Sequence, residues 1–160
     1  MNKKLIKKIL IGFCIVILLV IVDQWSKLLA VDRLKDQNSF EVIKNLLTFE
    51  YAENPGAAFS SFLNQQTFLC IITVVALFIF MYYLITCKDR ITFVGILLAI
   101  GGTIGNFIDR IRLEYVVDFI HLSFFSPIFN VADICLTVGI ALIVIMIVKD
   151  GVISLKEENK

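Results

Sequence analysis

The sequence is poor in the residues that a soluble protein places on its surface. Only 18% of its 160 residues are charged, and the formal net charge is +1. It contains no basic stripe and no glycine-rich phosphate loop. We therefore expect no nucleic-acid partner, because nucleic-acid binding needs clustered positive charge.

The chain is also poor in potential metal ligands. It has a single histidine, His121, and four cysteines that lie in or at the ends of apolar runs. A zinc site needs closely spaced ligands, and a disulfide framework needs cysteines in polar loops. We expect no metal and no organic cofactor, and we interpret the cysteines as small hydrophobic residues within helices.

Apolar residues are abundant instead. They make up 59% of the chain, compared with roughly 45–50% in soluble proteins, and the mean hydropathy is +0.89. A helix that crosses a bilayer needs about 20 mostly apolar residues. The sequence predicts one domain, residues 1–160, an all-α polytopic membrane protein with four transmembrane helices. The four stretches are residues 8–30, 67–87, 91–109 and 131–148.

The first stretch resembles a secretory signal peptide, because basic residues precede an apolar run over residues 9–22. The run ends in Asp23-Gln24-Trp25, without the small residues of a cleavage site. Cys14 follows Phe13, whereas a lipobox cysteine follows a small residue. We therefore expect an uncleaved first helix.

Lysine and arginine predict the orientation, since short cytoplasmic loops are enriched in both. One side holds Lys3, Lys4, Lys7, Lys8, Lys88, Arg90, Lys149, Lys156 and Lys160. Fewer basic residues are spread over the connections 31–66 and 110–130. Both termini are predicted to be cytoplasmic, and both long connections to be outside.

The first outer connection has the pattern of a strand. Residues 47–51 alternate apolar and polar, and Asn54-Pro55-Gly56 is typical of a turn. These residues predict a small extracytoplasmic sheet on the membrane surface.

Three helices carry a polar residue at the same depth. Counted from the cytoplasmic basic residues, Asp23, Asn106 and Asp133 each lie roughly 22–24 Å along their helices. Polar groups at membrane depth are costly and mark functional sites. The coincidence predicts one site at the outer ends of helices one, three and four.

Two carboxylates could meet at this site. Asp118 lies fifteen residues before Asp133 in the second outer connection, so the chain can fold back between them. Other interpretations stay open on spacing alone: Asp118 as a hydrated loop residue, and Asp133 as the N-cap of its helix.

The remaining charges have structural alternatives. Asp23 and Lys27 are spaced i, i+4 and can form an interfacial ion pair. Asp109 and Arg110 can form an ordinary helix end, in which Asp109 pairs locally with Arg110. The glycines of helix three, Gly101, Gly102 and Gly105, predict close helix packing.

Other functions explain the pattern less well. A transporter would place polar residues at several depths, but helix two offers only Thr73 as a polar interior residue. A membrane scaffold explains none of the carboxylates. A serine–lysine peptidase would need Ser60 or Ser61 to reach Lys27.

Five motifs in order resemble the lipoprotein signal peptidase family, also called signal peptidase II. They are Asp23-Gln24 with Lys27, Asn54-Pro55-Gly56-Ala57-Ala58-Phe59, Gly101-Gly102-x-x-Gly105-Asn106-x-x-Asp109-Arg110, Val116-Val117-Asp118-Phe119 and Phe129-Asn130-x-Ala132-Asp133. The resemblance implies four transmembrane helices with a small extracytoplasmic β-cradle between helices one and two. It implies an aspartyl endopeptidase in the bacterial cytoplasmic membrane. That enzyme removes the signal peptide from diacylglyceryl-modified prolipoproteins by cleaving before the lipidated cysteine.

The resemblance also implies roles for particular residues. Asp118 and Asp133 would be catalytic. The residues that would bind substrate, and the inhibitor globomycin, are Asn54, Gly56, Asn106, Arg110 and Asn130. The supporting residues would be Asp23, Lys27, Asp109 and Ala132. We expect a monomer whose partners are prolipoproteins and membrane lipid. Two features depart slightly from the family pattern: Cys135 and the short interval between Asp118 and Asp133.

Overall fold

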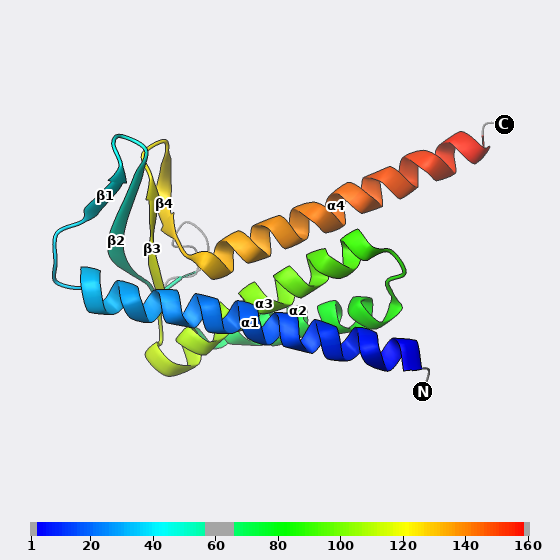
Figure 1. Ribbon diagram of the computed structural model, residues 1–160, viewed down its shortest axis with the longest axis horizontal. Helices are drawn as coiled ribbons and strands as arrows, with labels where there is room; N and C mark the ends of the chain where they lie inside the picture. The colour runs from blue at the N-terminus through cyan, green and yellow to red at the C-terminus, as the bar shows by residue number, and fades with distance from the viewer. Residues whose placement is uncertain (1–2, 57–65, 159–160) are drawn as a thin grey trace.

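The computed structural model describes residues 3–56 and 66–158 (Figure 1). Residues 57–65, which hold the predicted Ala57-Ala58-Phe59 motif and both candidate serines, Ser60 and Ser61, lie outside the described residues. In the described part, the elements in chain order are α1 (Lys3–Leu34), β1 (Phe40–Ile43), β2 (Leu47–Asn54), α2 (Gln66–Thr86), α3 (Arg90–Leu113), β3 (Val116–Leu122), β4 (Phe125–Phe129) and α4 (Val131–Glu158).

Three of these helices are long and apolar enough to cross a membrane: α2, α3 and the Val131–Gly151 part of α4. The fourth, α1, is 32 residues long. Between residues 9 and 22 it exposes large apolar side chains, among them Leu10, Phe13 and Leu18. This pattern supports the prediction that α1 also spans, because lipid is the solvent in which such side chains are stable.

The helix boundaries differ from the predicted spans at the sheet end. The predicted first span ends at residue 30, whereas α1 continues to Leu34. The predicted third span ends at Asp109, whereas α3 continues to Leu113. Glu114 ends α3 with a left-handed φ of 65°, and its N–H donates to the Arg110 carbonyl. Arg110 therefore lies within α3, on the same helix as Asn106 and Asp109.

A four-stranded antiparallel sheet lies at one end of the helices, in the order β1-β2-β3-β4 (Figure 1). The first of the two long connections supplies β1 and β2, as expected. The second supplies β3 and β4, which the sequence reading missed. Asp118 consequently lies on β3, opposite Ala52 of β2, and its interpretation as a loop residue is wrong.

The inner strand β3 joins the sheet to the first helix. Val117 and Phe119 of β3 are buried with Ala30 of α1, and Val31 and Leu34 pack against them. Burial of this apolar surface fixes the sheet over the C-terminal end of α1. The strand that carries Asp118 is thereby held directly above the helices.

Close helix contacts bring the polar residues together. A side chain at Gly102 would overlap the backbone carbonyl of Ala132 in α4, and a Cβ at Gly101 would lie 2.8 Å from Leu19 Cδ1 in α1. The glycines of α3 therefore act as predicted, by letting α1 and α4 approach its backbone. The central helix α3 brings the ends of both neighbours to one place.

Candidate active site

Asp133 and Asn130 form a reciprocal cap at the start of α4. The Asn130 side-chain oxygen accepts from the Asp133 N–H at 2.9 Å, and Asp133 Oδ2 accepts from the Asn130 N–H at 3.1 Å. This is the geometry of a capping box. Asn130 is thus the N-cap of α4, and Asp133, the third residue of the helix, completes the cap with one of its oxygens without being the N-cap itself. Its other oxygen, Oδ1, accepts from Asn106 Nδ2 at 2.7 Å.

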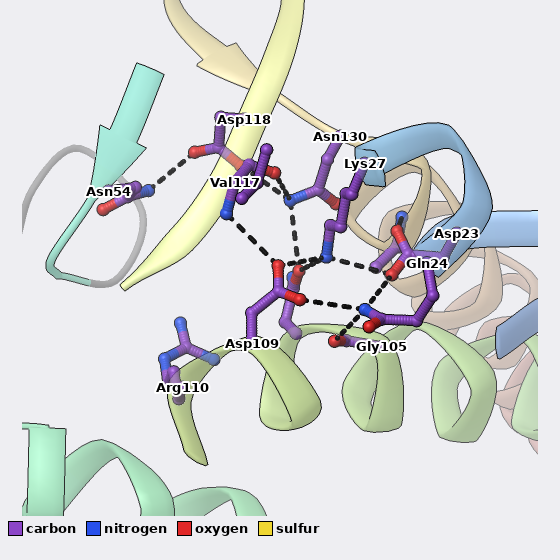
Figure 2. Close-up of polar contacts among 12 residues, drawn as sticks. Asp23, Gln24, Lys27, Asn54, Gly105, Asp109, Arg110, Val117, Asp118 and Asn130 are labelled. Atoms are coloured by element: carbon purple, nitrogen blue, oxygen red, sulfur yellow. Dashed lines mark hydrogen bonds and ion pairs between the residues drawn. The ribbon is translucent and has the colours of Figure 1, made fainter. Parts of the chain in front are cut away.

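Asp118 approaches the same cap from β3. Figure 2 shows its carboxyl between two amides: Asn54 Nδ2 donates to one oxygen at 2.9 Å, and Asn130 Nδ2 donates to the other at 2.6 Å. Asn130 therefore contacts both carboxylates. The 15-residue interval brings Asp118 and Asp133 to one site because β3 and β4 fold back as a hairpin before α4 begins.

The environment of Asp118 favours the protonated carboxyl. Asp118 is only 2% exposed. Burial, followed by the negative charge of Asp133, raises the pKa of Asp118 from 3.8 to about 7. The hydrogen bonds from Asn54 and Asn130 act in the opposite direction, since they stabilise the ionised form. A carboxyl that keeps its proton near neutral pH can serve as a general acid.

Asn106 links the two carboxylates to a buried cation. Its side-chain oxygen accepts from Asn130 Nδ2 at 3.1 Å and from Lys27 Nζ at 2.8 Å. Its amide nitrogen donates to Asp133. Both ends of this amide are therefore engaged in the network.

Lys27 is the centre of a second polar layer beneath the carboxylates. It is 3% exposed, and its ammonium lies 2.9 Å from Asp23 Oδ2 and 3.0 Å from Asp109 Oδ2. The interfacial Asp23–Lys27 pair predicted as an alternative is thus buried, and Asp109 pairs with Lys27, not locally with Arg110. The local-pairing prediction is wrong because Asp109 faces α1, where Lys27 lies (Figure 2).

The two acids of this layer also hold backbone from distant elements. Asp23 Oδ1 accepts from the Ala132 N–H at 2.9 Å, so α1 caps the first turn of α4. Asp109 Oδ2 accepts from the Val117 N–H at 3.2 Å, which fixes the start of β3. Asp23 thus positions the helix of Asp133, and Asp109 positions the strand of Asp118.

Gln24 belongs to this layer although we assigned it no role from the sequence. Its amide donates to Asp109 Oδ1 at 2.9 Å and to the Gly105 carbonyl at 3.1 Å. The available signal was a second polar residue beside Asp23 at membrane depth, where polar groups need partners.

The carboxylates open into a cavity of about 1040 Å³ between the sheet and helices α2, α3 and α4. Asn54, Asp118 and Asp133 line it, together with Arg110. The Arg110 guanidinium donates to the Gly56 carbonyl at 3.3 Å, while its buried Nε has no hydrogen-bond partner in the described structure. All five predicted substrate-binding residues therefore lie in or beside this cavity.

No group of three or more His, Cys, Asp or Glu side chains with metal-site geometry occurs among the described residues. His121 pairs with Glu50 at 3.0 Å on the sheet. Asp118 and Asp133 face one cavity, and two carboxyls so placed can act as an acid–base pair.

Comparison with known proteins agrees with this chemistry. The family model for signal peptidase (SPase) II matches residues 15–149. The chain belongs to the signal peptidase II family. It is accordingly an aspartic peptidase and a multi-pass membrane protein.

Relatives in this family match most of the chain. A lipoprotein signal peptidase of Clostridium tetani is 42% identical over 142 residues, which is 85% of this chain and 91% of that protein. One from Streptococcus pyogenes serotype M2 is 44% identical over 137 residues, or 84% of this chain and 90% of that protein.

Solved structures of bacterial membrane enzymes share the fold. One has a TM-score of 0.80 and 36% identity, and the match covers 88% of both chains. Another has a TM-score of 0.77 and 38% identity over 87% of this chain and 93% of the other. The helices and the sheet described above are therefore those of an experimentally determined enzyme fold.

Proposed function

We propose that Asp118 and Asp133 are the catalytic pair of this signal peptidase. The reaction is hydrolysis of the peptide bond before the lipidated cysteine of diacylglyceryl-prolipoproteins. The observation that carries the proposal is the shared amide: Asn130 bonds Asp118 at 2.6 Å while its own backbone and side chain cap Asp133. Two acids from different elements are thereby held at one cavity.

The proposed chemistry uses one proton shared by the pair, since two neighbouring carboxyls cannot both ionise cheaply. The ionised carboxyl takes a proton from water as the water oxygen bonds to the scissile carbonyl carbon. The protonated carboxyl stabilises the developing oxyanion. The carbon–nitrogen bond then breaks, and the leaving amine takes a proton from the pair. The raised pKa of Asp118 keeps a proton available near neutral pH.

The substrate peptide must find hydrogen-bond partners in this buried site, because an unpaired peptide group in an apolar setting is costly. Arg110 offers a buried Nε without a partner in the described structure. Asn54 and the Gly56 segment lie at the same end of the cavity. We assign these groups to the peptide on either side of the scissile bond, and we expect globomycin to compete for them in a monomeric enzyme.

The proposed orientation places both termini in the cytoplasm and the active site at the outer face. The start of α1 and the last turns of α4 lie at the end of the molecule away from the sheet (Figure 1), which supports a common side for the termini. A reporter fused at residue 1 or 160 should behave as cytoplasmic, and one inserted near Gln37 as external. A cytoplasmic signal at Gln37 would overturn the orientation.

The decisive experiment compares purified wild type, Asp118→Asn and Asp133→Asn on lipidated and unlipidated prolipoprotein in detergent. Wild type should cleave the lipidated precursor, and each variant should be inactive although it folds. The double variant should be scarcely worse than either single variant, because the pair acts as a unit. Substantial activity in folded Asp118→Asn, or equal cleavage of both precursors by wild type, would refute the proposal.

Asp109→Asn is the matched control, since Asp109 is the nearest other carboxylate. Its loss should reduce the amount of folded protein more than the turnover of each folded molecule, because it holds Lys27 and the Val117 N–H. An inactive but fully stable Asp109→Asn would move the catalytic role to Asp109.

A further inference from the structure

The cavity continues past the carboxylates into the space between three helices. Threonine side chains from all three line this deeper part: Thr73 of α2, Thr103 of α3 and Thr137 of α4. The neighbouring wall is apolar and includes Ile134, Leu136 and Val138. The deeper cavity is therefore an apolar space that carries a few hydroxyl groups.

The threonines of α3 and α4 lie at one level. Thr103 precedes Asn106 by three residues, and Thr137 follows Asp133 by four. The two helices are antiparallel in the chain, and Asn106 and Asp133 are hydrogen-bonded to each other. Both hydroxyls consequently lie one helical turn inward from that bond, roughly 4.5–6 Å along the helix axes.

These two hydroxyls differ from the third. A threonine within a membrane helix commonly donates to the carbonyl four residues earlier, and Thr73 does so, to Leu69 at 2.7 Å. Among the described residues, neither Thr103 nor Thr137 makes a side-chain hydrogen bond of the kind that Thr73 makes. Thr103 is only 8% exposed. Thr137 is exposed. Both residues line the cavity, so their hydroxyl donors are available to a group that enters it, and burying them there without an acceptor would be costly.

We propose that Thr103 and Thr137 bind the ester carbonyls of the substrate's diacylglyceryl group. The inference rests on the proposed function, because it takes the scissile bond to lie at Asp118 and Asp133. An ester group accepts hydrogen bonds and donates none, which matches two hydroxyl donors. Its acyl chains match the apolar wall. The ester carbonyls are joined to the lipidated cysteine through its thioether and the glycerol carbons, so they reach about one helical turn beyond the cleavage point.

The test compares two synthetic prolipoprotein peptides of one sequence. One carries a diacylglyceryl thioether, and the other carries the dialkyl ether analogue, which lacks both ester carbonyls. Wild type should cleave the diester with roughly three- to tenfold higher kcat/KM per carbonyl bond. Thr103→Val and Thr137→Val should lose much of this preference through a higher KM for the diester, with similar rates on the diether. Thr86→Val is the control, because Thr86 is not among the residues that line the cavity and bonds only carbonyls of its own helix.

Each outcome decides the inference. Equal cleavage of diester and diether by wild type overturns it, and that measurement needs no variant to fold. Valine variants that slow both peptides equally also overturn it, since the hydroxyls would then act on the peptide or on packing. Failure of wild type to cleave either peptide would instead refute the proposed function itself.

Discussion

Lys27 Nζ lies 2.8 Å from the side-chain oxygen of Asn106, and this contact fixes which way the Asn106 amide faces. An ammonium only donates hydrogen bonds, so the amide oxygen must face Lys27. The amide nitrogen is then left to donate to Asp133 at 2.7 Å. Lys27, which does not line the cavity, thus determines through Asn106 how Asp133 is held.

Lys27→Met should destabilise the protein strongly. Methionine keeps much of the length but removes the cation, and Asp23 and Asp109 are left buried without it. Removal of one partner from a buried ion pair costs roughly 3–5 kcal/mol. We expect a large fall in the thermal unfolding midpoint in detergent, and loss of cleavage in whatever protein remains folded.

The matched control for Lys27 is Lys35→Met. Lys35 also pairs with a carboxylate, Glu53 at 3.1 Å, but both side chains are substantially exposed. Exposed pairs contribute little to stability, so the unfolding midpoint should hardly move. Similar losses in the two variants would show that the buried cation has no special role.

The pH dependence of the enzyme should reflect Asp118. Its pKa is raised to about 7, so kcat/KM should fall as pH rises through about 7 and the pair loses its last proton. The raised pKa also means that the folded state holds the proton more tightly than the unfolded state. This contribution to stability is complete below the unfolded pKa and is lost as pH rises to about 7. Asp118→Asn should therefore be more stable than wild type at pH 8, and equally stable near pH 3.

Substitution of Asn54 should move this pH dependence. The Asn54 amide bonds the Asp118 carboxylate at 2.9 Å and lowers its pKa. In Asn54→Ala the pKa of Asp118 should rise further, which shifts the falling limb of the pH profile of kcat/KM to higher pH. Asn38→Ala, at an exposed position, should leave the profile unchanged. A shift to lower pH in Asn54→Ala would contradict the assignment of Asp118 as the titrating group.

Gly105→Ala should weaken the join between α1 and α4. A Cβ there would lie 2.5 Å from Asp23 Oδ2, the carboxylate whose other oxygen caps Ala132. Overpacking of this kind costs typically about 1–3 kcal/mol. Gly151→Ala is the control, since a Cβ at Gly151 meets nothing within 4 Å and alanine favours a helix. Chemical or thermal unfolding of both variants should show a loss for Gly105 and none for Gly151.

Some of the site could be predicted from the sequence because membrane helices impose a simple geometry. The rise per residue placed Asp23, Asn106 and Asp133 at one depth. In the structure Lys27 contacts both Asp23 and Asn106, and Asn130 bonds Asn106. Helix periodicity along a known axis is enough for that inference.

What the sequence could not provide was the direction of side chains and the pairing of strands. The run of residues 116–122 lacks the alternation of a half-exposed strand, because residues 116–119 are all buried. Its assignment as β3 depends on its pairing with β2, a contact between distant parts of the chain. For the same reason Asp109 was assigned to its neighbour Arg110, whereas packing turns it toward Lys27.

The cap that Asp23 places on Ala132 joins residues 109 positions apart. Synthesis produces α1 first and α4 last. Asp23 is therefore made long before Ala132, the residue whose N–H it binds. Until α4 arrives, Asp133 is absent and Asp23 has no helix start to hold. If the proposed pair of Asp118 and Asp133 is catalytic, the chain can therefore cleave substrate only after its last helix has been made and has docked against α1.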